Sequence, residues 1–203
     1  MFDIGCQFES DSPLIFKKEN MNIYLVADTH FSHFNIMKYC KRPFSTVEEM
    51  NEVMIDNWNK LVRPNDEIYH LGDFGFGSHE KIKEIRKKLN GKIHLILGNH
   101  DIKGRLDKLR VWESVQHAKH IKGLDKPLYA VHYCPKVWYN SHYNSYGIYG
   151  HSHGGLNSYA EKEGKLLDVG VDTNNFKPYH LDEVLEIMKT RPDNFNYIKR
   201  RTT

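Results

Sequence analysis

Five short blocks of this chain consist of residue types that bind divalent metals. They are Asp28-Thr29-His30, Gly72-Asp73, Gly98-Asn99-His100-Asp101, His132 and Gly150-His151-Ser152-His153. Transition metals in proteins bind imidazole nitrogen together with carboxylate and amide oxygen. The five blocks together indicate one metal site assembled from five loops, and such a site is suited to hydrolysis with two metal ions.

The spacing within the blocks also suits metal binding. Residues i and i+2 of a strand, or of the turn that leaves it, point the same way, so Asp28 and His30 can reach one ion. His151 and His153 form a second pair of this kind. Asp73 follows a glycine that permits a sharp turn, and its two carboxylate oxygens can bridge two cations. Each block alone is also a common turn or an ordinary histidine, so the prediction rests on all five together.

Short apolar runs precede the first three blocks and predict the strands that position them. These strands are expected at residues 23–26, 67–71 and 93–97, each directly before one block. The carboxyl ends of parallel strands meet at one edge of a sheet. We therefore expect the three blocks to lie close together at that edge.

Two helices are expected between these strands. The capping-box sequence Ser45-Thr46-Val47-Glu48 opens the first helix, which ends before the turn at residues 63–66. Ser78 caps the second helix, which closes at Asn90-Gly91. This alternation of strands and helices predicts an α/β fold.

The second half of the chain is richer in strands. The strands expected there are residues 128–131, which lead into His132, residues 147–149, which lead into Gly150, and residues 165–171. A last helix is expected at residues 181–189, capped by His180 or its neighbour.

Composition excludes several classes of protein. The net charge of +3 is too mild to indicate nucleic-acid binding by itself. Cys6, Cys40 and Cys134 are widely spaced and form no CxxC pair, which favours a reducing compartment over a disulfide framework. No apolar run approaches the ~18 residues of a membrane span. Residues 1–20 lack the pattern of a signal peptide, so we expect a cytoplasmic protein without a membrane partner.

The length of 203 residues predicts one main domain. We expect it at residues 21–190. Residues 1–20 are predicted to be an N-terminal extension, either disordered or an added edge strand. Residues 191–203 are predicted to be an exposed basic tail.

The order of the five blocks closely resembles the calcineurin-like metallophosphoesterase superfamily, whose blocks read D-x-H, G-D, G-N-H-D or G-N-H-E, H, and G-H-x-H. The resemblance covers residues 21 to about 180. A narrower resemblance, to a small bacterial and phage-type branch, rests on three segments. They are Asp-Thr-His-Phe-x-His at 28–33, Arg42-Pro43-Phe44 and Leu71-Gly72-Asp73-Phe74.

The resemblance implies a fold and a role for each block. The fold it implies is a central two-sheet β-sandwich flanked by helices. The implied ligands are Asp28, His30 and His153 for the first metal, Asn99, His132 and His151 for the second, and Asp73 between them. His100 would contact the phosphate and protonate the leaving oxygen, with Asp101 behind it as the residue that orients its ring.

The function implied is that of a dinuclear-metal-dependent phosphoesterase. It would be a phosphodiesterase or phosphatase that hydrolyses small phosphoesters or nucleotides through a metal-bridging hydroxide. The ligand set suits Mn, Fe, Zn, Co or Ni, and Mn is the metal we expect first. Two alternatives stay open: a nuclease that grips DNA or RNA with its basic tail, and a scaffold that has lost catalysis. The sequence does not indicate an oligomeric state.

Three residues near the first block are candidates for substrate binding, namely His33, Asn35 and Arg42. Arg42 can make a bidentate contact to phosphate or pair with the helix near Ser45. His33 can face the substrate or pack. The aromatic residues Trp138, Tyr139, Tyr143 and Tyr146 can stack a nucleobase, but we expect them to pack.

Overall fold

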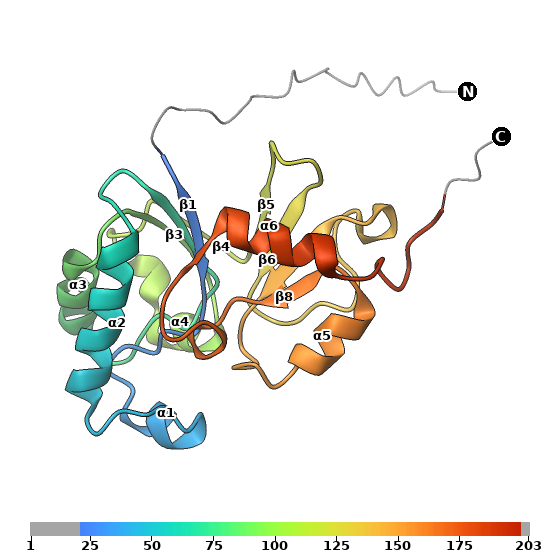
Figure 1. Ribbon diagram of the computed structural model, residues 1–203. Coiled ribbons are helices and arrows are strands. Elements are labelled where there is room, and N and C mark those ends of the chain that lie inside the picture. The colour runs from blue at the N-terminus through green and yellow to red at the C-terminus, as the bar shows by residue number, and fades with distance from the viewer. Residues whose placement is uncertain (1–20, 200–203) are drawn as a thin grey trace.

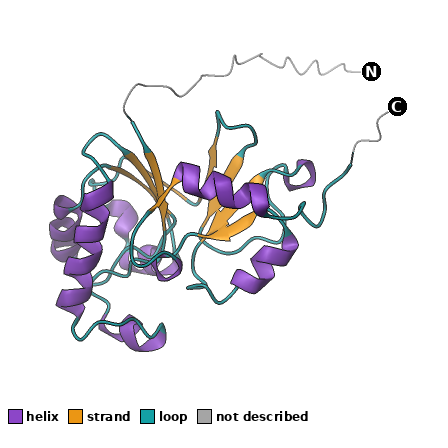
Figure 2. Ribbon diagram, viewed as in Figure 1, coloured by secondary structure: helices purple, strands orange, loops and turns teal. Residues whose placement is uncertain are grey.

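The computed structural model describes residues 21–199. The predictions for residues 1–20, and for residues 200–203 of the tail, lie outside this range. Two mixed β-sheets pack face to face, and helices cover their outer faces (Figures 1 and 2). The predicted α/β fold, with two central sheets flanked by helices, is confirmed.

The first sheet has the strand order β4-β3-β2-β1-β9. Its strands are β1 (Ile23–Val26), β2 (Glu67–His70), β3 (Lys92–Ile96), β4 (Ser114–Gln116) and β9 (Tyr179–His180). Strands β1 to β4 are parallel, and β9 pairs antiparallel with β1. The carboxyl ends of β1, β2 and β3 therefore meet at one edge, as the sequence predicts.

The second sheet has the strand order β5-β6-β7-β8. Its strands are β5 (Ala118–Ile121), β6 (Leu128–Val131), β7 (Tyr146–Tyr149) and β8 (Leu166–Asp168). Strands β6, β7 and β8 are parallel, and β5 is antiparallel to β6. This sheet therefore also gathers the carboxyl ends of neighbouring strands at one edge.

Six α-helices complete the described chain. They are α1 (Phe34–Tyr39), α2 (Val47–Leu61), α3 (His79–Lys88), α4 (Asn99–Gly104), α5 (Asn157–Glu163) and α6 (Leu181–Thr190). Short 3-10 turns occur at Leu106–Lys108, Ser141–Tyr143 and Val171–Thr173. No helix within residues 21–199 has the length and apolar composition that a membrane span requires.

The pleat of β1 divides the core into two layers. Val26 faces α2 and α3 and lies in a cluster with Met54 and Trp58 of α2. Leu25 points the other way and packs between the sheets with Ile148 of β7. Helix α6 contacts β1 of the first sheet and β8 of the second, so it holds the two sheets together (Figure 1).

Every strand and helix predicted from the sequence is present, with small shifts at the ends. The helix cap predicted at Ser45 lies one residue later, because the Thr46 hydroxyl accepts the Glu49 N–H. The sequence missed α1, α4, α5, β4, β5 and β9. Most of these elements are too short to show a hydrophobic period, and β5, with the sequence Ala-Lys-His-Ile, lacks the apolar run that marks β1. The predicted exposed tail is also partly buried, since Asn194 is 2% exposed and its side chain bonds Lys165 and Ser141.

His70 connects the loops that follow β1 and β2. Its Nδ1 accepts the Gly72 N–H at 3.2 Å, so the ring proton of the neutral form is on Nε2. Nε2–H then donates to Thr29 Oγ1 at 2.9 Å, and the Thr29 hydroxyl donates to the Phe74 carbonyl at 2.7 Å. Burial lowers the pKa of His70 to about 3, so this relay holds a neutral imidazole at neutral pH.

The His70 relay predicts a specific dependence of stability on pH. The folded-state pKa is below the ordinary value of 6.5, so the unfolded chain binds the extra proton as the pH falls from 6.5 toward 3. His70→Asn removes this site. We expect wild-type stability to fall by about 2 kcal/mol relative to this variant between pH 7 and pH 5. Urea unfolding at both pH values measures the difference, and parallel changes in the two proteins would contradict the relay.

Candidate metal centre

The five blocks meet where strands of both sheets end. Asp28 follows β1, Asp73 follows β2, Asn99 follows β3, His132 follows β6 and His151 follows β7. All five strands are parallel members of their sheets, and the parallel bridge between Ala27 and Gly170 joins the two sheets where β1 and β8 end. The structure brings residues of all five blocks together in the clusters described next.

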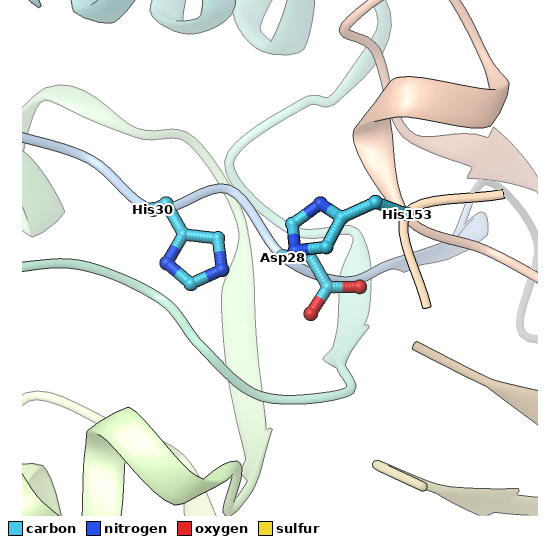
Figure 3. A group of neighbouring side chains, drawn as sticks. All are labelled: Asp28, His30 and His153. Carbon is cyan, nitrogen blue, oxygen red and sulfur yellow. The ribbon is translucent and has the colours of Figure 1, made fainter. Parts of the chain in front are cut away.

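The first cluster consists of Asp28, His30 and His153. Each offers one ligand atom, and these atoms lie within 4.8 Å of one another. Figure 3 shows the three side chains converging from two loops, one after β1 and one after β7. The His30 and His153 rings are stacked with centroids 5.2 Å apart. Such a group of ligand atoms could hold one metal ion.

The second cluster consists of Asp73, His132 and His151, whose ligand atoms also lie within 4.8 Å of one another. Asn99 joins it, because its Oδ1 is 3.2 Å from His132 Nε2. Asp73 stands between the two clusters. Its Oδ2 is 3.6 Å from His30 Nε2 and 3.6 Å from His132 Nε2. One carboxylate oxygen therefore faces an imidazole of each cluster.

The hydrogen bonds of His132 fix which of its nitrogens faces the cluster. Nδ1–H donates to the Leu71 carbonyl at 2.7 Å, so Nε2 of the neutral ring has a lone pair. That lone pair faces Asn99 Oδ1, which is also an acceptor. A cation between the two atoms satisfies both. This is the tautomer and orientation that a metal-binding histidine requires.

His153 is held in the same manner by Asp172. Its Nδ1–H donates to Asp172 Oδ2 at 2.6 Å, which leaves Nε2 for the cluster. Burial lowers the pKa of His153, but the bonds to Asp172 and Cys40 and the charge of Asp28 outweigh it and raise the pKa to about 10. A metal that binds at Nε2 therefore displaces a proton.

Several buried polar atoms of the site have no hydrogen-bond partner in the protein. They are Asp28 Oδ1, both ring nitrogens of His30, and His100 Nδ1. Burial raises the pKa of Asp28 well above its ordinary value and, with neighbouring cations, keeps that of His30 far below the normal value. Buried polar atoms are ordinarily bonded, so such a group indicates a missing partner. A carboxylate beside a neutral imidazole fits a divalent transition metal.

The backbone at the site is strained. Five of the seven predicted ligands have left-handed backbone angles, with φ between 48° and 67°, namely Asp28, His30, Asp73, His151 and His153. Such angles cost about 1–3 kcal/mol each in a non-glycine residue. The backbone at Gly98 passes so close to Asp73 that a Cβ there would lie 2.2 Å from Asp73 Oδ1. Strained backbone of this kind is typical of functional sites, where it positions the side chains.

His33 and His100 lie beside the first cluster. The His33 ring is 5.5 Å from His30 and 6.0 Å from His100, measured between centroids. Its Nδ1 caps helix α1 by accepting the Ile36 N–H at 2.9 Å, so the proton of the neutral ring is on Nε2. His100 Nε2 is 3.9 Å from Asp73 Oδ2, and the side chain is 30% exposed. Asn35 is exposed on α1.

Two predicted residues lie elsewhere than the sequence suggested. Asp101 does not contact the His100 ring. Its carboxylate instead accepts the N–H groups of Asp73, Phe74 and Gly98 at 2.7–2.9 Å, because it faces back from the first turn of α4. It therefore ties the loop after β2 to the loop after β3.

Arg42 is 4% exposed, and its guanidinium is taken up by contacts within the protein. Its guanidinium donates to Asp172 twice, at 2.8 Å, and to the carbonyls of Asp28 and Thr29. Its Nη1 also donates to Met50 Sδ of α2 at 3.6 Å, so Arg42 does contact the helix near Ser45. Arg42 supports the backbone of the first block and holds Asp172 in place.

Asp172 is the residue that sequence analysis missed. It connects Arg42 to His153 and so joins the loops after β1 and β7. The sequence offers one signal, a carboxylate just past the last predicted strand of the second sheet, but the segment Val171-Asp172-Thr173 has no metal-ligand spacing.

The chain is similar to known proteins over most of its length. Residues 21–170 match the family described as calcineurin-like phosphoesterase superfamily domain. An uncharacterized protein of Methanocaldococcus jannaschii is 38% identical over 172 residues, which cover 82% of this chain and 91% of that protein. The crystal structure of a protein of unknown function from Aquifex aeolicus has a TM-score of 0.67 and 26% identity, covering 83% of this chain and all of that one.

Asp28→Asn tests the first cluster. The substitution removes a buried charge, so we expect the metal-free variant to be at least as stable as wild type. With Mn²⁺ at 100 times its Kd, wild type should gain about 2.7 kcal/mol, a rise in Tm of roughly 5–11 °C. The variant should gain much less. Thermal unfolding with Mn²⁺ and with chelator measures this, and equal Mn²⁺ shifts in both proteins would show that Asp28 is not a ligand.

Asp172→Asn tests the support behind His153. Loss of the carboxylate that orients a metal-binding histidine costs roughly 10–100-fold in metal affinity. We expect the Kd for Mn²⁺ to rise by this factor, measured by titration calorimetry. Asp182→Asn is the matched control, because that carboxylate is 82% exposed and should leave the Kd unchanged. An unchanged Kd in the Asp172 variant would overturn its supporting role.

Proposed function

The chain belongs to the calcineurin-like phosphoesterase superfamily, and we propose that it hydrolyses phosphoric esters with two divalent metal ions. The observation that supports this most is the position of Asp73 between two clusters of ligand atoms. The buried acceptors that lack protein partners support it further. We propose small phosphoesters or nucleotides as substrates.

Asp28, His30 and His153 would hold one ion, and Asn99, His132 and His151 the other, with Asp73 shared. The mixture of imidazole, carboxylate and amide ligands favours Mn, Fe, Zn, Co or Ni. Among these metals, we propose Mn. When bound, such ions activate water as a nucleophile and neutralise charge on phosphoryl oxygens. The ligand set is complete, which argues against a scaffold that has lost catalysis.

His100 is the residue that we propose as proton donor to the leaving oxygen. Its Nε2 lies on the Asp73 side of the ring, and the side chain is partly open to solvent. Its ligand atom also lies within 4.8 Å of those of His30 and Asp73, so the proposed role places it directly beside the ions and leaves its ring to move a proton. Its backbone N–H donates to Asp73 Oδ1 at 2.9 Å, which ties the start of α4 to the carboxylate proposed to be shared.

His33 is the residue that we propose as a donor to the phosphate. Its Nδ1 is used by the helix cap, so Nε2–H is left to donate to a phosphoryl oxygen. Asn35 is exposed on the same helix and is proposed as a contact at the rim.

We propose that the protein works in the cytoplasm. Cys40 and Cys134 are both free thiols, which is what a reducing compartment favours.

A generic aryl phosphodiester, assayed beside the matching monoester with Mn²⁺ and with chelator, tests this proposal. We expect turnover that requires the metal, and the faster ester then assigns the enzyme as a diesterase or a monoesterase. Steep loss of activity with salt on a DNA or RNA substrate would favour the nuclease instead. Absence of turnover for every ester, with metal bound, would contradict the proposed hydrolase.

His100→Asn tests the proton donor. Removal of a general acid lowers kcat by roughly 10²–10⁴-fold, and the metal content should be unchanged. The loss should be larger for diphenyl phosphate than for bis(p-nitrophenyl) phosphate, because phenol is the poorer leaving group. Full activity in the variant, or an equal loss for both esters, would remove His100 from this role.

A further inference from the structure

Phe76 is an exposed aromatic residue that the proposed chemistry does not use. Its ring lies against His33, with centroids 4.2 Å apart, and against His100, with centroids 4.9 Å apart. The side chain is 37% exposed, so the two imidazoles cover part of the ring and solvent reaches the rest. A large apolar surface thus stands directly beside the proposed proton donor.

The backbone holds this ring in a fixed position. The Phe76 N–H donates to the Phe31 carbonyl at 2.7 Å, and Gly75 forms a β-bridge with Phe31. Phe31 is fully buried and directly follows His30. The Phe76 backbone is therefore tied to the loop of the first cluster, and only two residues separate Phe76 from Asp73.

A phenyl ring has no hydrogen-bonding group with which to bind phosphate. It binds other apolar or flat groups, and aromatic stacking on a nucleobase is worth ~1–3 kcal/mol. A residue beside the proton donor is also beside the group attached to the leaving oxygen. The chemistry of Phe76 therefore matches the leaving group and not the phosphoryl group.

We propose that Phe76, supported by His33, is the specificity-determining platform for the leaving group, and that it selects esters whose leaving alcohol has a flat ring. Aryl and nucleoside phosphodiesters are of this class. The inference rests on the proposed hydrolysis and on His100 as its proton donor.

The other aromatic residues near the site do not offer the same surface. Tyr133 lies on the opposite side, against His132 and His151, and its hydroxyl points to Asn99 Oδ1 at 3.4 Å. Trp138 is 7% exposed and packs in the core, as expected. Tyr139 stacks on His120 with centroids 4.4 Å apart. None of these rings adjoins His100 in the described contacts.

The test compares two esters with Phe76→Leu, which keeps an apolar side chain but removes the ring. The esters are bis(p-nitrophenyl) phosphate, with a ring in its leaving group, and bis(trifluoroethyl) phosphate, without one. We expect the ratio of their kcat/KM values to fall about 10-fold in the variant, a stacking loss of ~1.4 kcal/mol. Phe76→Trp should restore the ratio.

Tyr39→Leu is the matched control. Its exposed ring lies 6.5 Å from His33, beyond the platform, and its loss should leave the ratio unchanged. An unchanged or raised ratio in Phe76→Leu would overturn the proposal. A residue that only positioned His100 would slow the trifluoroethyl ester at least as much, because trifluoroethanol is the poorer leaving group. Failure of Phe76→Trp to restore a lowered ratio would also overturn it.

A second measurement separates this inference from the proposed hydrolysis. If Mn²⁺-loaded wild type hydrolyses neither ester, the hydrolase proposal fails. The binding of two phosphate monoesters then tests whether Phe76 recognises a flat ring. Wild type should bind phenyl phosphate more tightly than methyl phosphate, and Phe76→Leu should remove that preference. Equal binding of the two monoesters by wild type would overturn the platform as well.

Discussion

Asp73 is bound at three of its polar groups by the loops around it, which leaves one carboxylate oxygen to face the imidazoles. Its N–H donates to Asp101, its carbonyl accepts the His30 N–H, and its Oδ1 accepts the His100 N–H. Oδ2 is thereby directed at His30 and His132. A carboxylate that is only 2% exposed is stabilised by a positive partner, such as a metal ion.

The rest of the fold maintains this geometry. The two sheets supply the carboxyl ends of five strands, and buried polar contacts join the loops that follow them. His70 joins the loops after β1 and β2, Asp101 joins those after β2 and β3, and Asp172 joins those after β1 and β7. These bonds offset left-handed backbone angles at five predicted ligands. These bonds hold the predicted ligand atoms in place, and such rigidity raises the affinity of a metal site.

Much of this arrangement could be predicted from the sequence, because strand periodicity and the order of metal-ligand blocks are local signals. Contacts that join distant residues left no such signal. Arg42 was expected to be near the phosphate, yet its bond to Asp172 spans 130 positions. Asp101 was expected to orient its neighbour His100, but the start of α4 directs its carboxylate to the Asp73 and Phe74 amides. Neither α4 nor Asp172 had a pattern that could have corrected these expectations.

Anomalous diffraction from crystals of the Mn²⁺-loaded protein tests the central claim most directly. We predict two manganese peaks per chain, about 3.5–4 Å apart, with Asp73 between them. One ion should lie among Asp28, His30 and His153, and the other among Asn99, His132 and His151. A single peak, or two peaks that do not share Asp73, would contradict the account, since the convergence of both clusters on that carboxylate would then have no function.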